Sequence, residues 1–470
     1  MEETINGTTK TRAADTWEAR DVAHIWHPAA QMKDYEELPP IVVDRAKGVW
    51  LYDVYGKKYL DVISSWWCNL FGHCNPIVSD AVKAQLDKLE HVIFANFSHE
   101  PAIRLAEALA EIVPKGLTKF HFNDNGSSAV EAALKMAFQY HVQTGAPKRK
   151  KFMCLSEGYH GETIGALSVG SMDLYAKLYR PMLMESIHIE APDCYRCPYG
   201  KSRGCCACEC FEHAEKAFAD HADETAAIIV EPLLQGSAGM RVYPELYLQK
   251  LRKLCDETGV LLIADEIATG FGRTGEMFAC IRAGISPDLM TVSKGLTAGY
   301  LPMSVTCTTD AIYDAFYADW NEGKAFVHSH TFAGNPLACA AALAVQHIFR
   351  TQPIMPNAAV NAKWLTKRME DELLPHPNVG EIRHIGLIHA FELVADKQTK
   401  TPLDPKKRTG YQVYRKALKR GLLLRPIGDV LYFNPPLNIT QAELETALSL
   451  AKAALLDVLP MYRIPSETAE

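Results

Sequence analysis

The chain has 470 residues, of which 48% are hydrophobic and 22% are charged, values typical of a globular protein large enough for two domains. Its formal net charge is −7, so the chain as a whole offers no basic field that would attract nucleic acid. No apolar run approaches the roughly 20 residues of a membrane-spanning helix, and the N-terminal residues mix acids and bases unlike a signal peptide. We therefore expect a cytoplasmic protein that binds neither membrane nor nucleic acid.

The order of the predicted elements indicates an α/β fold with a mostly parallel sheet. A β-hairpin is expected over residues 48–62, with its turn at Tyr55-Gly56-Lys57. Further elements follow in chain order, with buried strands at 119–122, 151–155, 226–232, 260–266 and 288–293, helices at 127–142 and 244–259, and a late strand at 430–435. We predict a large domain of residues 76–344, and a smaller α+β domain in which the N-terminal segment 1–75 joins the C-terminal part 345–470.

Gly126, Ser127 and Ser128 lie between the first strand of the predicted sheet and the helix that follows it. A helix N-terminus presents free backbone N–H groups and a favourable dipole, so this turn is suited to binding an anion such as phosphate. Ser127 or Ser128 could equally serve only as a helix cap. The motif alone leaves both roles open.

A glycine-flanked loop with Tyr159 and His160 follows the predicted strand at 151–155. In open parallel sheets the ligand binds beyond the carboxyl ends of the strands, which makes this loop a candidate. An aromatic side chain there can stack on a flat ring, although single Tyr and His residues in loops more often serve the structure.

Asp265 and Glu266 end the predicted strand at 260–266. A buried carboxylate is costly unless a cationic group pairs with it, so this pair favours a site over a turn cap. The following residues 270–275, GFGRTG, match a dinucleotide-binding pattern. In such a site the glycines connect a strand directly to a helix, and an acidic residue follows about twenty positions later. Here the acids come first, so we expect no nicotinamide cofactor.

Lys294 ends another predicted strand, 29 residues after Asp265, among small neighbours. A lysine in a crowded, dry site loses proton affinity and becomes a nucleophile that can form a Schiff base. Thr331 precedes a further predicted helix and offers a second phosphate contact.

These candidates together suit one cofactor, pyridoxal 5'-phosphate. Lys294 would condense with its aldehyde, and Asp265 would keep its pyridine nitrogen protonated. The remaining groups are Tyr159 for stacking on the ring and Gly126, Ser127 and Thr331 for the phosphate.

Three longer motifs occur in a characteristic order and spacing: LLIADEIATGFGRTG at 261–275, VSKGL at 292–296 and HTFAGNPLACAAAL at 330–343. Together they resemble the class III aminotransferases, which are pyridoxal phosphate enzymes of fold type I. The resemblance runs from about residue 20 to about residue 460. It implies a large domain with a mostly parallel sheet, a smaller α+β domain, and a homodimer with active sites at its interface.

The resemblance also implies roles for individual residues. Lys294 would form the Schiff base and carry the proton between substrate and cofactor, while Asp265 would pair with the pyridine nitrogen. Tyr159 falls at a catalytic position that contacts both cofactor and substrate. The positions that bind the cofactor phosphate are Gly126, Ser127, His330 and Thr331, the last two reaching in from the partner subunit.

Four further segments narrow the resemblance: HIWHP at 24–28, SSWWCNLFGH at 64–73, EGYHGETIGALSVGS at 157–171 and RPIGDVLYFNPPL at 425–437. They are similar to the branch that converts 8-amino-7-oxononanoate to 7,8-diaminononanoate in biotin biosynthesis. This similarity implies that Arg425 binds the substrate carboxylate and that the other substrate contacts are Trp66, Trp67, Tyr159 and Ser329. Aromatic walls and a guanidinium suit a fatty-acid-like keto substrate. Without the resemblance, core packing of the tryptophans and a surface ion pair of Arg425 would be the simpler expectation.

The amino donor stays open between S-adenosylmethionine and lysine. Members of this branch that use S-adenosylmethionine commonly carry Tyr where this chain has Ala29, whereas the nearby letters QMKDYEE look closer to the members that use lysine. We place S-adenosylmethionine first and keep lysine. The alternative function is a class III enzyme that transfers amino groups from other ω-amines, such as a diamine or β-alanine, to pyruvate.

Six of the thirteen cysteines lie between Cys194 and Cys210. Their spacing, which begins C-x-x-C, would suit a zinc or redox site. The segment nevertheless lies away from every residue assigned to the cofactor, and its beginning, APDCYRCPYG, is similar to a class III loop that binds no metal. We therefore expect no metal here and keep zinc as the alternative.

Overall fold

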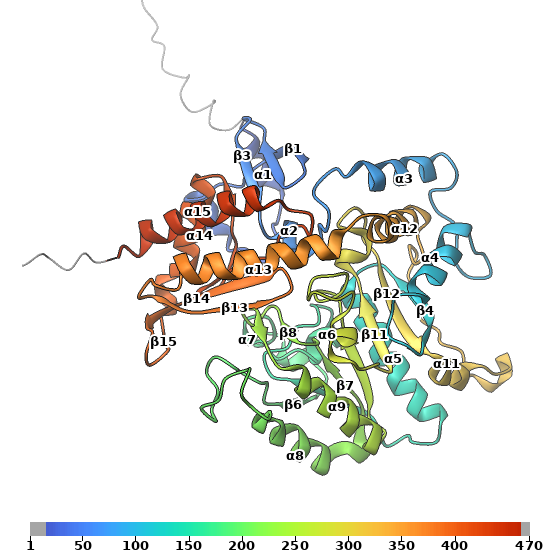
Figure 1. The fold of residues 1–470 in the computed structure, drawn as a ribbon. Helices are drawn as coiled ribbons and strands as arrows, with labels where there is room; N and C mark the ends of the chain where they lie inside the picture. The colour runs from blue at the N-terminus through green and yellow to red at the C-terminus, as the bar shows by residue number, and fades with distance from the viewer. Residues whose placement is uncertain (1–15, 462–470) are drawn as a thin grey trace, which may run out of the picture.

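A computed structural model describes residues 16–461 of the chain. Residues 1–15, on which the expectation about a signal peptide depends, and residues 462–470 lie outside the described part. Within residues 16–461, no helix combines the length and the apolar character needed to cross a membrane. Figure 1 shows a larger body built around a central sheet, and beside it a smaller body in which the blue N-terminal strands lie against red C-terminal helices.

Seven strands form the central sheet, in the order β4-β12-β11-β10-β7-β5-β6. Their bounds are Leu117–Asn123 (β4), Lys151–Leu155 (β5), Ile187–Ile189 (β6), Thr225–Val230 (β7), Leu261–Asp265 (β10), Leu289–Val292 (β11) and Ser304–Thr309 (β12). The neighbours from β11 to β6 pair in parallel, whereas β12 pairs antiparallel with β4 and β11. The prediction of a mostly parallel sheet is confirmed, and each predicted strand of this sheet is found within two residues of its expected ends.

Helices cover both faces of the central sheet. They are α3 (Pro76–Leu86), α4 (Glu100–Ala110), α5 (Gly126–Gln143), α6 (Ile164–Ser168), α7 (Asp173–Ala176), α8 (Glu212–His221), α9 (Glu245–Thr258), α10 (Ala279–Ala283), α11 (Asp310–Phe316) and α12 (Pro336–Thr351). A short hairpin, β8 (Leu234–Gln235) and β9 (Arg241–Val242), follows β7. The two helices predicted at 127–142 and 244–259 correspond to α5 and α9.

Alternate residues of the parallel strands face opposite helix layers. Ile229 and Ile263 belong to a cluster that also contains the apolar face of α5. Ile228 and Leu262 belong to another, which includes residues of α8 and α9. Because both faces are buried, these strands are apolar along their whole length, as a parallel sheet requires.

The smaller body combines the two ends of the chain. Its first sheet has the order β1-β2-β3-β16, and β16 pairs in parallel with β3, placing Leu422 opposite Leu60. The bounds are Val43–Lys47 (β1), Trp50–Asp53 (β2), Lys58–Asp61 (β3) and Leu422–Leu423 (β16). The predicted hairpin at 48–62 corresponds to β2 and β3, which pair antiparallel. The predicted limits of the two domains stay a prediction.

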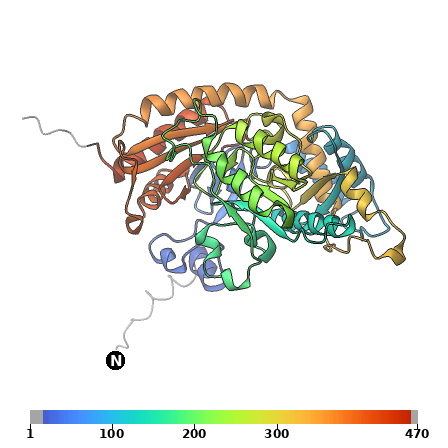
Figure 2. The same ribbon diagram turned by 90° about the horizontal axis from the view of Figure 1, so that it is seen from below.

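A second sheet of the smaller body has the order β13-β14-β18-β17, and β15 pairs with β14. The bounds are Val379–Ile385 (β13), Ile388–Asp396 (β14), Thr401–Pro402 (β15), Pro426–Ile427 (β17) and Val430–Phe433 (β18), with the helices α1 (Trp17–His24), α2 (Ser64–Trp67), α13 (Ile354–Glu372), α14 (Thr409–Lys419) and α15 (Gln441–Val458). Figure 2 shows the long α13, in orange, running from α12 along the smaller body.

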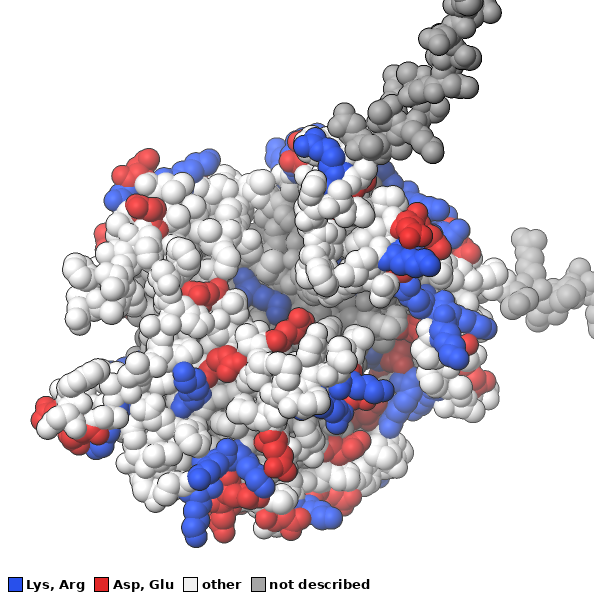
Figure 3. All heavy atoms as spheres, turned by 180° about the vertical axis from the view of Figure 1, so that it is seen from behind, with Lys and Arg blue, Asp and Glu red and all other residues white. Residues whose placement is uncertain are grey.

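Acidic and basic side chains are interspersed on the face of the molecule drawn in Figure 3.

Candidate active site

Three strand ends of the central sheet and one helix N-terminus bring polar groups to one edge. Asp265 is the last residue of β10, Lys294 follows β11 after one serine, and Glu231 comes directly after β7. These three strands are parallel neighbours, so their carboxyl ends meet at the same edge. The N-terminus of α5 reaches this edge as well, because Gly126 approaches Ile267, two residues after Asp265.

Lys294 begins a short 3-10 turn with a left-handed backbone, at φ 37°. Loss of hydration lowers the pKa of its ammonium, although the nearby Asp265 and Glu231 act in the opposite direction. Its Nζ lies 5.4 Å from the centroid of the Trp67 ring. A partly buried lysine whose pKa is lowered is suited to act as a nucleophile and a proton carrier.

Asp265 is held by three donors. His160 Nδ1 lies 2.7 Å from its Oδ2, and its Oδ1 accepts hydrogen bonds from the Thr291 hydroxyl at 3.2 Å and the Ile267 amide at 3.1 Å. Asp265 and His160 are 4% and 3% exposed, so this pair is shielded from water. The arrangement orients a carboxylate at a strand end, as pairing with a pyridine nitrogen requires. Sequence reasoning placed His160 in the correct loop but gave it no role.

The turn into α5 offers room for a phosphate. Asn125 caps the helix by accepting a hydrogen bond from the Ser128 amide at 3.1 Å. The Gly126 and Ser127 amides donate no hydrogen bond to any residue of 16–461. A Cβ on Gly126 would lie 3.0 Å from Ile267 Cδ1, and one on Gly161 would collide with the Ser127 side chain. The two amides without partners lie in a turn where side chains larger than glycine would collide with neighbours. Such a turn fits the phosphate of pyridoxal phosphate.

Tyr159 and Glu231 line the same edge. The Tyr159 amide donates to Glu231 Oε1 at 3.1 Å, and its hydroxyl donates to Glu162 Oε1 at 3.1 Å. The Tyr159 ring lies 5.1 Å from the Tyr175 ring, tilted by 54°. Burial raises the pKa of the Glu231 carboxyl to about 7, although His160 lowers it. Sequence reasoning overlooked Glu231, but its position after an apolar strand gave the same signal that identified Asp265.

A turn with an unusual backbone presents the two tryptophans. Ser64, Ser65, Trp66 and Trp67 all have positive φ, between 43° and 74°. Trp67 is 6% exposed and its indole N–H donates to the Tyr432 hydroxyl at 2.9 Å, whereas Trp66 is 46% exposed. The core-packing expectation therefore fits Trp67 but not Trp66.

Arg425 lies over the exposed tryptophan, with its guanidinium carbon 4.8 Å from the Trp66 ring centroid. It donates a hydrogen bond to the Ala29 carbonyl at 3.2 Å and has no carboxylate partner among residues 16–461. It borders a cavity of about 460 Å³ whose aromatic walls come from Tyr35, Tyr411 and Tyr414. The surface ion pair considered for Arg425 is therefore absent from the described residues, and its contact with the substrate carboxylate stays a prediction.

Ser329, His330 and Thr331 lie on the irregular segment that precedes α12. Ser329 and Thr331 are exposed, and His330 Nδ1 lies 3.0 Å from Asp124 Oδ2 in the same chain. The structure does not bring Ser329 or Thr331 to Lys294. Their contribution to the site of a partner subunit stays a prediction.

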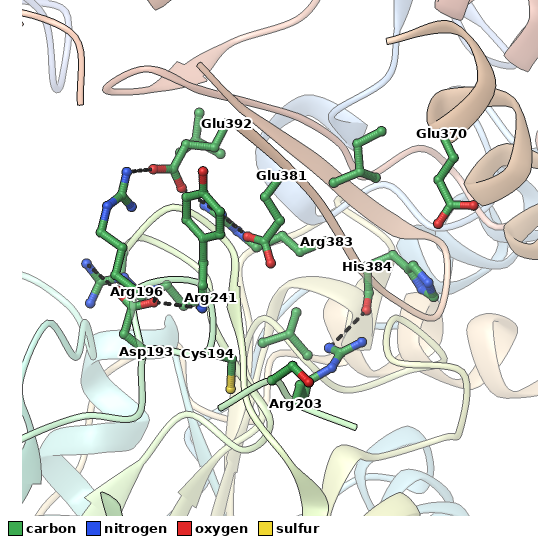
Figure 4. A pocket seen from close by; sticks show the side chains of 16 residues that line it. Asp193, Cys194, Arg196, Arg203, Arg241, Glu370, Glu381, Arg383, His384 and Glu392 are labelled. Atoms are coloured by element: carbon green, nitrogen blue, oxygen red, sulfur yellow. Dashed lines mark hydrogen bonds and ion pairs between the residues drawn. The ribbon is translucent and has the colours of Figure 1, made fainter. Parts of the chain in front are cut away.

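The cysteine-rich segment lies beside a different pocket. All thirteen cysteines are free thiols, and burial raises the pKa of Cys194 and Cys208 to about 12. Within residues 16–461, no three His, Cys, Asp or Glu side chains are grouped so that they could hold a metal ion. Figure 4 shows Cys194 at a pocket of about 320 Å³, where an ion pair from Arg196 to Glu392 joins the segment to β14. None of the residues predicted to bind the cofactor lines this pocket.

The GFGRTG segment adopts turns and begins no helix, since α10 starts only at Ala279. A dinucleotide site of the strand-turn-helix type is therefore not formed here. Arg273 within this segment is only 2% exposed and points into the protein.

Comparison with known proteins gives a family for this arrangement. The family model of class III aminotransferases matches residues 31–455. A protein of Geobacter sulfurreducens named adenosylmethionine-8-amino-7-oxononanoate aminotransferase is 44% identical over 436 residues, which cover 93% of this chain and 95% of that protein. The protein of the same name from Methanocaldococcus jannaschii is 42% identical and covers 90% of this chain and 94% of its own length.

Solved structures agree with this family. The crystal structure of adenosylmethionine-8-amino-7-oxononanoate aminotransferase from Methanocaldococcus jannaschii has a TM-score of 0.88 at 40% identity, covering 94% of this chain and 98% of that one. An (S)-enantioselective ω-transaminase from Thermomicrobium roseum has a TM-score of 0.89 at 33% identity, with the same coverage of 94% and 98%. The predicted fold type I is thereby confirmed. The chain belongs to the class III aminotransferases and is a pyridoxal phosphate-dependent transaminase.

Proposed function

We propose that this aminotransferase converts 8-amino-7-oxononanoate to 7,8-diaminononanoate in biotin biosynthesis, with S-adenosylmethionine or lysine as the amino donor. The observation that carries the proposal is the position of Arg425 over Trp66 at the border of an aromatic cavity. A substrate with a methylene chain and a terminal carboxylate matches an aromatic wall that ends in a guanidinium. The names of relatives that cover 90% or more of this chain support the same substrate.

The residues at the sheet edge divide the work. Pyridoxal phosphate, when bound, supplies an aldehyde for amino groups and a ring that accepts carbanion electrons. Lys294 Nζ would hold the cofactor through that aldehyde and would move the proton at the reacting carbon of the substrate. Asp265 would hold the pyridine nitrogen, and the Gly126 and Ser127 amides would hold the phosphate. Tyr159 would stack on the ring.

The proposal includes a cytoplasmic homodimer in which His330 and Thr331 complete the phosphate site of the partner subunit. Exposed apolar side chains on the same segment support an interface there, since Val327 is 81% exposed and Phe332 is 62% exposed. Contiguous exposed apolar patches, unlike single exposed residues, commonly mark interaction sites.

A donor and acceptor screen tests the proposed reaction. S-adenosylmethionine or lysine should convert the bound cofactor to its amino form, a change that is measured by absorbance. Addition of 8-amino-7-oxononanoate should then restore the starting spectrum of the enzyme. Lys294→Ala should remain folded and show neither change. Rapid return with pyruvate and none with 8-amino-7-oxononanoate would select the ω-amine:pyruvate alternative instead.

The Arg425→Ala variant tests the binding of the substrate carboxylate. The KM for 8-amino-7-oxononanoate should rise by about 10–100-fold, because a charge-assisted hydrogen bond contributes about 1.5–3 kcal/mol. Arg415→Ala is the matched control, since Arg415 pairs with Glu37 at 2.8 Å and does not border the cavity. Equal KM values for the two variants would contradict the assigned role of Arg425.

A further inference from the structure

The turn that carries the tryptophans requires an external support. Residues 64–67 form a left-handed helical turn, in which the Trp67 amide donates to the Ile63 carbonyl at 2.8 Å and the Cys68 amide donates to the Ser64 carbonyl at 3.1 Å. Left-handed backbone is unfavourable for residues with a Cβ and is normally visited by single residues. Four such residues in a row persist only where the surrounding structure holds them.

Arg273 supplies part of that support, beside the Ser64 hydroxyl, which donates to the Asn434 carbonyl at 2.7 Å, and the Ser65 hydroxyl, which donates to Asp61 Oδ2 at 2.7 Å. Its Nη2 donates to the carbonyls of Trp67 at 3.2 Å and Asn69 at 3.1 Å, and its Nη1 donates to the Pro435 carbonyl at 2.6 Å. The side chain is 2% exposed and forms no ion pair with any carboxylate of residues 16–461. One guanidinium of the larger body therefore joins the exit of the left-handed turn to the segment that follows β18.

The chemistry of arginine suits this position. A planar guanidinium presents five donors in a fixed arrangement, so it can serve carbonyls from two chain segments at once. Three carbonyl dipoles partly replace the hydration that the buried cation loses. Lysine would bring a single nitrogen to this region. It could not occupy both the position of Nη1, which faces Pro435, and the position of Nη2, which faces Trp67 and Asn69.

The turn touches the site at two points. Trp67 lies 5.4 Å from Lys294 Nζ, and Trp66 lies under Arg425 at 4.8 Å. A Cβ on Gly236 would come within 2.9 Å of the Trp67 ring, so this tryptophan has little freedom to shift toward β8. A displacement of the turn would therefore move the wall next to the nucleophile and the wall next to the guanidinium together.

We propose that Arg273 is a positioning residue, which holds the left-handed turn of residues 64–67 so that Trp66 and Trp67 form the substrate walls. It acts through three backbone carbonyls and touches neither substrate nor cofactor. The consequence for substrate binding rests on the proposed function, whereas the consequence for the turn itself does not.

Hydrogen exchange of the folded holoenzyme, followed by mass spectrometry, tests the proposal independently of activity. In Arg273→Lys, the amides of Trp67, Cys68 and Asn69 should exchange about tenfold faster or more, because their hydrogen bonds belong to the released turn. Arg383→Lys is the matched control, since Arg383 is also buried and donates to the Gly239 and Met240 carbonyls. The control should leave exchange at 67–69 unchanged.

Kinetics complete the test. Arg273→Lys should raise the KM for the keto acceptor about tenfold with a smaller change in kcat, as expected when a binding wall moves. Arg273→Gln, which keeps an amide donor without the buried charge, provides a second variant should the first not accumulate in folded form. Unchanged exchange at 67–69, or exchange raised equally throughout the chain, would overturn the proposal. Faster exchange at 67–69 in an enzyme that never accepts 8-amino-7-oxononanoate would overturn the proposed function and leave the role of Arg273 standing.

Discussion

His160 connects the loop after β5 to Asp265, the residue proposed to pair with the pyridine nitrogen. Its Nδ1 lies 2.7 Å from Asp265 Oδ2, and both side chains are buried. Because Asp265 also receives hydrogen bonds from Thr291 and Ile267, its orientation depends on a small network and not on its own rotamer. We therefore expect the rate of the reaction to fall when a hydrogen bond of this network is removed.

Two substitutions of His160 test that expectation. His160→Leu should lower kcat by about 10–100-fold, because a hydrogen bond to a charged group contributes about 1.5–3 kcal/mol. His160→Asn places an amide donor near the position of Nδ1 and should recover much of that loss. Single-turnover rates of the two variants and of the unaltered enzyme measure these effects. Equal rates in all three proteins would show that the contact with Asp265 has no catalytic effect.

Residues after strand ends were the best predicted part of the site. The rule that ligands bind beyond the carboxyl ends of parallel strands identified Lys294 and Asp265 and applies equally to Glu231. No comparable rule reaches Arg273, because its partners are backbone carbonyls of Trp67 and Asn69, 206 and 204 positions away in the chain. Backbone carbonyls carry no sequence signal, so only the structure could reveal this contact.

At the scale of elements, the start of α5 combines two requirements that oppose each other. Gly126 occupies the first helical position, and glycine favours a helix less than alanine does. The same position borders Ile267, with 3.0 Å between the added Cβ and Ile267 Cδ1. Space beside Ile267, next to the proposed phosphate site, therefore opposes helix stability at this residue.

Gly126→Ala should separate these effects. The apoenzyme should unfold at nearly the same denaturant concentration, because crowding against Ile267 offsets the gain in helix propensity. The cofactor dissociation constant should rise roughly tenfold as one hydrogen bond to the phosphate is lost. Equilibrium unfolding and cofactor titration measure the two quantities. A tighter-binding variant would show that the α5 turn does not hold the phosphate.

Strand β14 carries a buried histidine that makes stability depend on pH. His389 is fully buried, and its Nε2 lies 2.8 Å from the Thr366 hydroxyl. Loss of hydration lowers the pKa of the imidazole to about 3. The unfolded chain binds a proton near pH 6.5, so this residue contributes stability above that value, and the contribution is lost as pH falls toward 3.

Between pH 7 and pH 5, His389 should therefore account for a decrease of about 2 kcal/mol in the free energy of unfolding. The variant His389→Gln does not titrate in this range and should lack that part of the decrease. Urea unfolding at both pH values measures it. Parallel pH dependence of the two proteins would contradict the assignment.

Strand β12 shows where reading the elements from sequence failed. Its letters SVTCTT contain no continuous apolar run, yet Val305, Thr306 and Cys307 are all fully buried. Burial of the threonines is possible because their hydroxyls donate to backbone carbonyls, as Thr306 does to Ala129 at 2.9 Å. A strand with satisfied buried hydroxyls has the composition of a loop, which is why it was not predicted.

At the scale of the whole molecule, the exposed segment before α12 predicts assembly. Phe332→Asp should weaken the proposed dimer, because the 62% exposed ring would be replaced by a charge at the interface. Analytical ultracentrifugation should show monomers at concentrations where the unaltered protein is dimeric, together with weaker cofactor binding. A monomeric unaltered protein with full activity would remove the partner roles assigned to His330 and Thr331.

The composition of the smaller body from both chain ends was predicted from the different patterning of the terminal segments, and the pairing of β16 with β3 joins them. The cysteine-rich segment was harder to interpret, since spacing suggested a metal and the structure shows free thiols beside an ion pair with β14. The spacing of cysteines along the chain predicts a metal site only when the folded loop brings their thiols together around one point.

The pairing of β3 with β16 also has a consequence for synthesis on the ribosome. Lys57 donates to the Leu418 carbonyl, 361 positions later, so the hairpin near the N-terminus lacks its neighbours until almost the whole chain has been made. At about 5–20 residues per second, that interval is on the order of 20–70 s. During that time the open edge of β3 is available to other nascent chains, and a chaperone that covers exposed strand edges should raise the yield of folded enzyme.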